Sequence, residues 1–278
     1  MLRYFVIKQI KLPNKFLLRK KNTLFIGKVF HEFPSLPSTN LYAAELLSKS
    51  KPSEGTVISA VHQTAGRGQI GSSWEAEAGQ NLTLSVILYP SFLPVHRQFL
   101  LNQAVALSVK DFITRYTEKP VKVKWPNDIY IGEEKVAGIL IQTSLNQKGF
   151  QNCIVGVGIN VNQRVFSPLL PNPTSLHLAT GRSYELPSLI EDYCLFLEQR
   201  YLQLKGGQWQ AIGEEYLRHL YRMGKKTRFE RTEGEQFTGE IAGIGASGQL
   251  LIRHGGTEEA FHLKEIKMLL PAGKKRLE

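Results

Sequence analysis

The chain has 278 residues, of which 42% are hydrophobic and 21% are charged, so it can bury a sizeable core. This composition excludes a chain that is disordered over most of its length. The formal net charge is +11, but positions 1–28 contain eight basic residues and no acidic residue, which leaves only +3 on the other 250 residues. Binding of a nucleic-acid duplex by the folded part is therefore weakly supported.

The first 22 residues, MLRYFVIKQIKLPNKFLLRKKN, are basic, lack serine and are interrupted by Pro13. This pattern favours a flexible extension over a targeting peptide. No run is long and apolar enough to cross a bilayer, and no membrane partner is expected. Cys153 and Cys194 lie far apart without CxxC spacing, so neither a zinc cluster nor a disulfide is predicted. These features fit a reducing, cytoplasmic compartment.

The first predicted elements alternate between strand and helix. Residues 24–33 are typical of a strand, and Ser38-Thr39-Asn40 are good N-cap residues before the helical pattern LYAAELLSK. Strands are predicted at 56–61 and 81–89, the second with period-two alternation. Residues 95–116 predict a long helix with one apolar face.

Four short strands are predicted next, at 121–125, 128–132, 135–145 and 153–161. Residues 163–173, QRVFSPLLPNP, predict a proline-marked loop, and two helices follow, separated at Gly206-Gly207. We therefore expect an α+β fold, a mixed and mainly antiparallel sheet with helices on one side.

The sequence pattern changes from Thr227 onward, where short runs of alternating apolar and polar residues are separated by glycines. About 45 residues of this kind suit a small β-barrel. The predicted organisation is an extension at 1–22, a main domain at 23–223 and a small barrel domain at 224–278.

The stretch HQTAGRGQIGSSW, residues 62–74, is rich in glycine and has almost no aliphatic residues, although it lies between two predicted strands. Its bare backbone N–H groups can approach an anionic or planar ligand, and the Arg67 guanidinium can bind a carboxylate or phosphate at two points. A flexible hairpin connection explains the glycines equally well. Neither a P-loop nor the dinucleotide fingerprint GxGxxG is present, so any nucleotide is held in another way.

Two further stretches combine strand patterns with glycine. In KWPNDIYIGEEKVAGIL, residues 124–140, Gly138 interrupts a strong strand, which suggests that something packs directly against the backbone. In VGVGINVN, residues 155–162, glycines two apart clear a flat floor on one strand face. Plain hairpin turns, a solvated Lys135 and a barrel bend are the structural alternatives.

In order, spacing and residue identity, these three stretches and Ser38-Thr39-Asn40 together resemble the biotin protein ligases, also called biotin–[acetyl-CoA-carboxylase] ligases, from about Phe30 to Leu270. The resemblance implies a catalytic domain of the class II aminoacyl-tRNA synthetase-like type and an SH3-like C-terminal barrel. It also implies ATP-dependent attachment of biotin to one lysine of a biotin carboxyl carrier domain. The intermediate would be biotinyl-5′-adenylate, with release of pyrophosphate and AMP and with Mg²⁺ as cofactor.

The resemblance assigns roles residue by residue. Catalysis would rest on two cations, Lys135 and Arg67, which bring two anions together, and on Asp128, which would orient or deprotonate the incoming lysine. No metal site within the protein is predicted. The biotin-binding residues would be Ser38, Thr39, Asn40, Gln63, Gly66, Arg67, Gly68, Lys135, Gly138, Leu140 and Gly156. The ATP- or adenylate-binding residues would be Arg67, Gln69, Trp74, Asn127, Lys135 and Asn160.

The sequence also departs from the family pattern. Many relatives carry further basic residues directly after GRG, where this chain has Gln69, Ile70, Ser72 and Ser73. No role is assigned to Lys264 in the barrel. Only about 28 residues precede the catalytic part, so we expect a form without a DNA-binding domain. Whether it is a monomer or a homodimer stays open.

Two alternative functions are retained. A lipoate or octanoate ligase or transferase of the related fold would show a different glycine-rich signature with a nearby His-Asp, or a cysteine nucleophile. A nucleic-acid-binding protein using the basic N-terminal tail would show steeply salt-dependent affinity.

Overall fold

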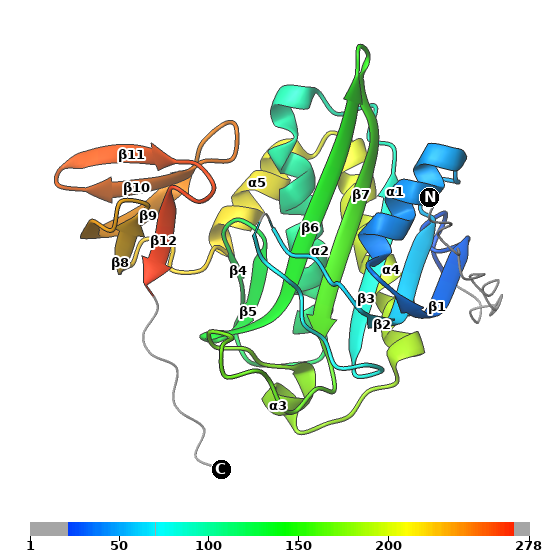
Figure 1. Ribbon diagram of the computed structural model, residues 1–278. Helices are drawn as coiled ribbons and strands as arrows, with labels where there is room; N and C mark the ends of the chain where they lie inside the picture. The colour runs from blue at the N-terminus through cyan, green and yellow to red at the C-terminus, as the bar shows by residue number, and fades with distance from the viewer. Residues whose placement is uncertain (1–21, 70, 270–278) are drawn as a thin grey trace, which may run out of the picture.

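The computed structural model describes residues 22–69 and 71–269, which form a seven-stranded sheet with helices and a separate five-stranded sheet (Figure 1). Apart from its last residue, the predicted extension at 1–22 lies outside the described residues. The elements of the larger unit are β1 (Phe30–Leu36), α1 (Thr39–Lys49), β2 (Val57–Gln63), β3 (Asn81–Leu88), η1 (Val95–Arg97), α2 (Phe99–Thr114), β4 (Val121–Lys124), β5 (Asp128–Ile131), β6 (Glu134–Asn146), β7 (Gly149–Asn160), α3 (Leu176–Thr180), α4 (Leu186–Lys205) and α5 (Trp209–Arg218).

The larger sheet has the strand order β1-β2-β3-β7-β6-β5-β4. β1 and β2 pair in parallel, whereas the other neighbouring strands pair antiparallel. The predicted α+β class with a mixed, mainly antiparallel sheet is confirmed. The short α3 was not predicted. It is capped by the Ser175 hydroxyl, which accepts from the Leu178 N–H, and it ends at Gly181 with a φ of 75°.

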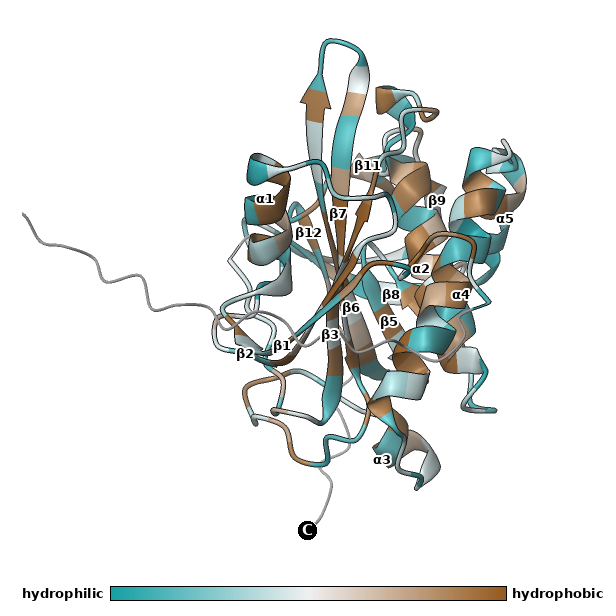
Figure 2. Ribbon diagram, turned by 90° about the vertical axis from the view of Figure 1, so that its right-hand side faces the viewer, coloured by the Kyte–Doolittle hydropathy of each residue, from teal (hydrophilic) through white to brown (hydrophobic). Residues whose placement is uncertain are grey.

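The two faces of this sheet are covered differently, as the side view in Figure 2 shows. Helices α2, α4 and α5 lie on one face, as predicted, while α1 lies on the other. The central strand β3 explains this difference, because all eight of its residues are buried. Its Leu84 and Val86 belong to the cluster under α2, whereas Ile87 packs with Ala43 of α1. β3 is therefore covered on both faces. The alternation along its sequence does not distinguish a solvent-facing side from a buried side.

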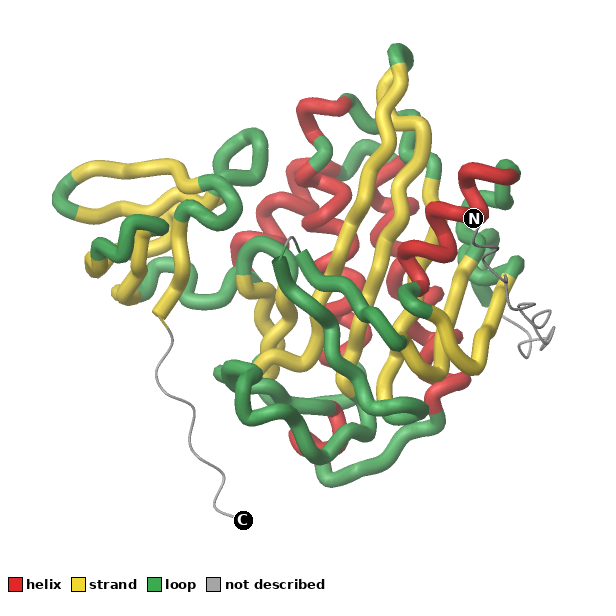
Figure 3. The backbone as a smooth tube through the Cα atoms, in the orientation of Figure 1, coloured by secondary structure: helices red, strands yellow, loops and turns green. Residues whose placement is uncertain are grey.

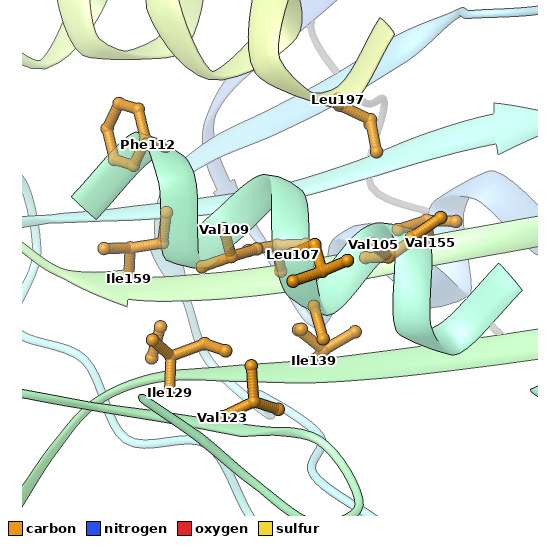
Figure 4. Close-up of a cluster of buried hydrophobic side chains, with 14 of the residues drawn as sticks. Val105, Leu107, Val109, Phe112, Val123, Ile129, Ile139, Val155, Ile159 and Leu197 are labelled. Atoms are coloured by element: carbon orange, nitrogen blue, oxygen red, sulfur yellow. The ribbon is translucent and has the colours of Figure 1, made fainter. Parts of the chain in front are cut away.

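The main core lies between α2 and the sheet (Figure 4). Val109 and Phe112 of α2 are fully buried against strand residues such as Ile139 and Ile159. Each such side chain contributes roughly 1.5–3 kcal/mol through burial. This core fixes β6 and β7 from behind, so their opposite face is a rigid platform.

Residues 24–29 do not form the predicted strand, which begins only at Phe30. Instead, the buried carboxylate of Glu198 in α4 accepts three consecutive backbone N–H groups, from Leu24 at 2.5 Å, Phe25 at 2.7 Å and Ile26 at 2.9 Å. A carboxylate that accepts three N–H groups satisfies them without a strand partner. The apolar pattern of this segment is typical of a strand. The N–H groups of Leu24, Phe25 and Ile26 nevertheless bind the Glu198 carboxylate and not a neighbouring strand.

The smaller sheet has the strand order β11-β10-β9-β8-β12 and is antiparallel throughout. Its strands are β8 (Lys226–Arg231), β9 (Gln236–Ile244), β10 (Leu250–His254), β11 (Thr257–Phe261) and β12 (Ile266–Leu269). It lies beside the β4 end of the larger sheet (Figure 1).

Specific contacts join the two sheets. In the linker after α5, the Val123 N–H donates to His219 O at 2.9 Å, and the Tyr221 N–H donates back to Val123 O at 2.7 Å. The indole N–H of Trp125 donates to Gly248 O at 2.9 Å. Trp125 is 8% exposed and thus belongs to the core. None of the helices in the described ranges is long and apolar enough to span a membrane.

Candidate active site

The face of the larger sheet that α2, α4 and α5 leave uncovered carries the glycine loop. After β2 the chain crosses in front of β6 and β7 before it enters β3 (Figure 3). A cavity of about 170 Å³, here called the sheet cavity, lies between this loop and the strands. The predicted site residues that line it are Ser38, Thr39, Asn40, Gln63, Arg67, Gly68, Gln69, Trp74, Asn127, Asp128, Lys135, Gly138, Leu140 and Gly156.

Three strand glycines form the floor of this cavity. Gly138 of β6 pairs with Gly158 of β7, and Leu140 pairs with Gly156, so these residues point to the same face. A Cβ at Gly158 would lie 2.3 Å from Cε2 of Trp74, and one at Gly138 would lie 3.1 Å from Cζ3 of that indole. The Trp74 ring therefore lies flat on bare backbone, and no side chain fits beneath it.

The far end of the sheet cavity is polar and buried. The Thr39 N–H and hydroxyl both reach Gln63 Oε1, at 2.8 and 3.2 Å. The Asn40 amide donates to Gln142 Oε1 at 2.9 Å and accepts from the Ser85 hydroxyl at 2.6 Å. A Cβ at Gly156 would lie 2.3 Å from Asn40 Oδ1, so glycine is required there as well.

Ser38 is the N-cap residue of α1 by position, but its hydroxyl makes no capping hydrogen bond. Its side chain is buried and lines the sheet cavity. Unlike the neighbouring Thr39 and Asn40 side chains, this hydroxyl has no hydrogen-bond partner within the described part of the chain. It is thus able to donate to or accept from a polar ligand atom.

Lys135 and Asp128 form an ion pair of 2.7 Å on the same sheet face. Their side chains are 33% and 19% exposed, so the charges are only partly screened by water. The backbone of Lys135 is fixed on its other edge, where its N–H donates to Asn172 O at 2.7 Å and its carbonyl accepts from the Thr174 N–H at 2.8 Å. The loop at 163–173 therefore positions Lys135.

Arg67 lies on the opposite side of the cavity, in the glycine loop. The loop is a small hairpin of its own, with an antiparallel bridge between Arg67 and Ser73 and a hydrogen bond from the Trp74 N–H to Gly66 O at 3.0 Å. The Gly68 N–H donates to Ser72 O at 2.9 Å. Arg67 is exposed, so its guanidinium is accessible to an incoming anion.

A larger cavity of about 640 Å³, here called the interdomain cavity, lies between this face and the smaller sheet. It shares Ser73, Trp74, Asp128 and Lys135 with the sheet cavity, so the two spaces meet at the ion pair. Asn160 lines only the larger one.

Two polar atoms in residues that line the interdomain cavity are buried without a partner within the described ranges. The indole Nε1 of Trp74 is an unsatisfied donor, and Oδ1 of Asn160 is an unsatisfied acceptor, while the Asn160 amide donates to Thr174 O at 2.9 Å. Asn127 is held in place, because its amide donates to Ile139 O at 2.6 Å. Unsatisfied buried groups are costly, and a ligand at this junction would satisfy them.

The structure thus brings together most of the residues singled out from the sequence. Gly66 does not line the sheet cavity, although a Cβ there would lie 2.3 Å from Trp74 O. Three further residues were not expected from the sequence to belong to the site: Ser85 and Gln142, which bind Asn40, and Lys124, which lines the interdomain cavity. The only sequence signal for Ser85 is a hydroxyl within a mainly aliphatic strand, and Thr83 of the same strand gives the same signal.

Comparison with known proteins agrees with this geometry. Residues 32–160 match the model of the Biotin/lipoate A/B protein ligase family. The bifunctional ligase/repressor BirA of Bacillus subtilis is 32% identical over 228 residues, which cover 81% of this chain and 68% of BirA. This chain belongs to the biotin protein ligase family.

Two other members of the family are close in length to this chain. The biotin–[acetyl-CoA-carboxylase] ligase of Mycobacterium tuberculosis is 30% identical over 83% of this chain and 86% of its own length. The solved structure of the biotin protein ligase from Aquifex aeolicus in complex with biotin and ATP has a TM-score of 0.72 and 26% identity. The match covers 88% of this chain and all of that one. The resemblance expected from the sequence is confirmed.

Proposed function

We propose that this protein attaches biotin to a lysine of a biotin carboxyl carrier domain, by way of biotinyl-5′-adenylate. The observation that carries the proposal is the meeting of two cavities at Lys135 and Asp128. An acid in the sheet cavity and a nucleotide in the interdomain cavity would face the same cation. Membership of the biotin protein ligase family and the relatives described above support the choice of substrates.

The sheet cavity suits biotin at both of its ends. A buried urea needs donors and acceptors, because each one left unpaired costs about 1–3 kcal/mol. The Ser38 hydroxyl and the Thr39–Gln63 pair offer such groups at the polar end. The apolar thiophane ring needs a flat surface, and the strand backbone that lines the cavity beside Leu140 would provide one. The valerate chain would then extend toward Lys135.

The first chemical step joins two anions. An oxygen of the biotin carboxylate attacks the α-phosphorus of ATP, the bond to the bridging oxygen breaks, and pyrophosphate leaves with the electron pair. Charge repulsion opposes this attack, so fixed cations on both sides lower its barrier and align the reactants. Lys135 approaches from the sheet and Arg67 from the loop. The Asp128 contact and the backbone pairing to Asn172 hold Lys135 in that position.

The adenosine part is assigned to the interdomain cavity. The unsatisfied acceptor Oδ1 of Asn160 can take a hydrogen bond from an amino group, and Trp74 Nε1 can donate one. Asn127 and Gln69, the other two predicted adenylate-binding residues, line only the sheet cavity, so they would contact the adenylate from its biotin side. The indole of Trp74 lies between the two cavities and offers a stacking face.

The second step transfers the biotinyl group to the carrier. The nitrogen of the incoming lysine attacks the carbonyl carbon of the mixed anhydride, and AMP leaves with the bridging oxygen. The amine must be neutral to attack, although the reference pKa of lysine is about 10.4. Asp128 lies at the junction and would accept its proton.

Mg²⁺ belongs to the proposed substrate, as the magnesium complex of ATP, where it neutralises charge on the departing pyrophosphate. The carboxylates on the interdomain cavity are Glu75 and Asp128, and the latter is paired with Lys135. In residues 22–69 and 71–269 no three acidic, histidine or cysteine side chains gather as ligands for a metal ion. The ion is therefore assigned to the phosphates.

The proposal is tested by incubating the full chain with biotin, MgATP and a purified biotin carboxyl carrier domain, followed by mass measurement of the carrier. We expect one biotinyl group per carrier, and biotin-dependent exchange of labelled pyrophosphate into ATP. Parallel reactions contain lipoate or octanoate in place of biotin. Modification of the carrier by those acids and not by biotin would overturn the substrate assignment, and exchange without any acid would overturn the mechanism.

A further inference from the structure

The glycine loop provides few cations for a triphosphate. After Arg67 it continues with Gln69, Ser72 and Ser73, none of which is charged. ATP brings four negative charges, and the pyrophosphate that leaves takes most of them with it. Further cations should therefore come from other walls of the interdomain cavity, which is where the nucleotide is proposed to lie.

Lys124, the last residue of β4, is one such cation. It pairs with Asp128 in register, and Tyr130 pairs with Lys135, so these side chains point to the sheet face that carries the site. The ammonium lies 5.9 Å from the centre of the Tyr130 ring and lines the interdomain cavity. No carboxylate in the described ranges lies within ion-pair distance of it.

The surroundings of Lys124 disfavour its charge while the cavity holds no anion. Burial lowers the pKa of Lys124, and the nearby Lys135 lowers it further, against the opposing attraction of Asp128. A polyphosphate beside this ammonium would reverse the balance, because an adjacent opposite charge favours the protonated form. The site is therefore built to gain from an anion.

Lys264 reaches the same cavity from the smaller sheet. It follows β11 in a turn and has a left-handed backbone, with a φ of 73°, which is uncommon for lysine. The Thr232 hydroxyl donates to its carbonyl at 3.0 Å and holds this turn. Its ammonium lies 3.8 Å from the position that a Cβ at Gly71 would take, so it faces the glycine loop directly.

We propose that Lys124 and Lys264 bind the β- and γ-phosphates of the nucleotide from opposite walls of the interdomain cavity. This inference rests on the proposed function. Lys264 would supply to the glycine loop a positive charge beyond that of Arg67, and the smaller sheet would thereby form part of the catalytic site. The two ammonium groups stabilise the charge that pyrophosphate carries away when the bond to the α-phosphorus breaks.

The test measures pyrophosphate binding to the full chain by calorimetry, without biotin. Replacing Lys264 with Met should weaken binding on the order of tenfold, the usual effect of losing one contact to a charged group. Lys124→Met should weaken it at least as much, and Lys124→Arg should restore most of the affinity. Lys226→Met, an exposed change in β8 away from both cavities, is the control and should have little effect.

Biotin affinity, measured separately, should stay unchanged in every variant, which shows that the sheet cavity is intact. Wild-type pyrophosphate affinity in both methionine variants would overturn the inference. So would a Lys124→Arg variant as defective as Lys124→Met, because arginine preserves the charge but cannot lose its proton. If the variants weaken pyrophosphate binding while the wild type shows no biotin-dependent exchange, the proposed function fails and the phosphate site stands.

Discussion

Gly158 offers a sharp test of how the site is built, because it has no chemical group of its own. Gly158→Ala would place a Cβ 2.3 Å from Trp74 Cε2, whereas ordinary contacts begin at about 3.4 Å. The indole must therefore shift by about 1 Å away from the sheet. Overpacking of this kind costs typically 1–3 kcal/mol. The residue lies within β7 without a left-handed backbone, so alanine itself is accepted by the strand.

The expected outcome is a loss of function that exceeds any loss of stability. A cost of 1–3 kcal/mol corresponds to a reduction of roughly 5- to 150-fold in the affinity for the adenylate. Alanine also lowers the conformational entropy of the unfolded chain, which raises the free energy of unfolding by up to about 1 kcal/mol. This gain offsets part of the stability lost through the clash with Trp74. The assay combines urea denaturation with biotin-dependent exchange of pyrophosphate.

The matched control is Gly243→Ala in β9, where a Cβ would meet Leu251 Cδ1 at an ordinary 3.9 Å. We expect this variant to exchange pyrophosphate at the wild-type rate. If Gly158→Ala also exchanges pyrophosphate at the wild-type rate, activity does not require the Trp74 indole to lie on the glycine floor. That result would refute our account of the junction.

Three more predictions concern the two catalytic cations and two residues of α4. Lys135→Ala and Arg67→Ala should each abolish biotin-dependent pyrophosphate release while the melting temperature changes little; wild-type turnover in Lys135→Ala would contradict the catalytic role. Glu198→Gln should lower the free energy of unfolding by about 1–3 kcal/mol, measured in urea, because the amide keeps one acceptor oxygen and turns an NH2 donor toward N–H groups that now bind the other. Arg200→Met should cost about 2–4 kcal/mol, because it leaves the Glu215 carboxylate without its partner at 2.5 Å. The hydrogen bond from Arg200 lowers the pKa of Glu215, so this stabilisation is complete above its ordinary pKa of 4.5 and is lost as the pH falls below it; a Glu215 contribution that survives in strong acid would refute the assignment.

The parts of the fold that could be predicted are those set by local chemistry. Glycines two apart on one strand can clear a face, so Gly156 and Gly158 indicated a flat floor, although a bend in the strand explained them equally well from the sequence. The Gly206-Gly207 pair separated two helices, because glycine is a poor helix former. The glycine loop and the KWPND turn were assigned to one site because both resemble one family, and residues of both line the sheet cavity.

Other features depend on partners that are far away in sequence. The turn at 24–29 exists because Glu198 lies beneath it, more than 170 positions along the chain. Nothing near Lys264 in the sequence indicates that its ammonium faces Gly71, because that contact depends on how the two sheets are placed. The site role of Ser85 follows from its hydrogen bonds to Thr39 and Asn40 across the sheet. Such long-range contacts are set by tertiary structure and have no local sequence signal.

The central claim is that biotin and the nucleotide meet between the glycine loop and the strand that carries Lys135. A crystal structure of the full chain with biotin and a non-hydrolysable ATP analogue tests it directly. We predict that the biotin carboxylate lies beside Lys135 with its ring over Gly156, and that the phosphates lie in the interdomain cavity. Biotin bound elsewhere, with the loop at 62–74 touching neither ligand, would contradict the account.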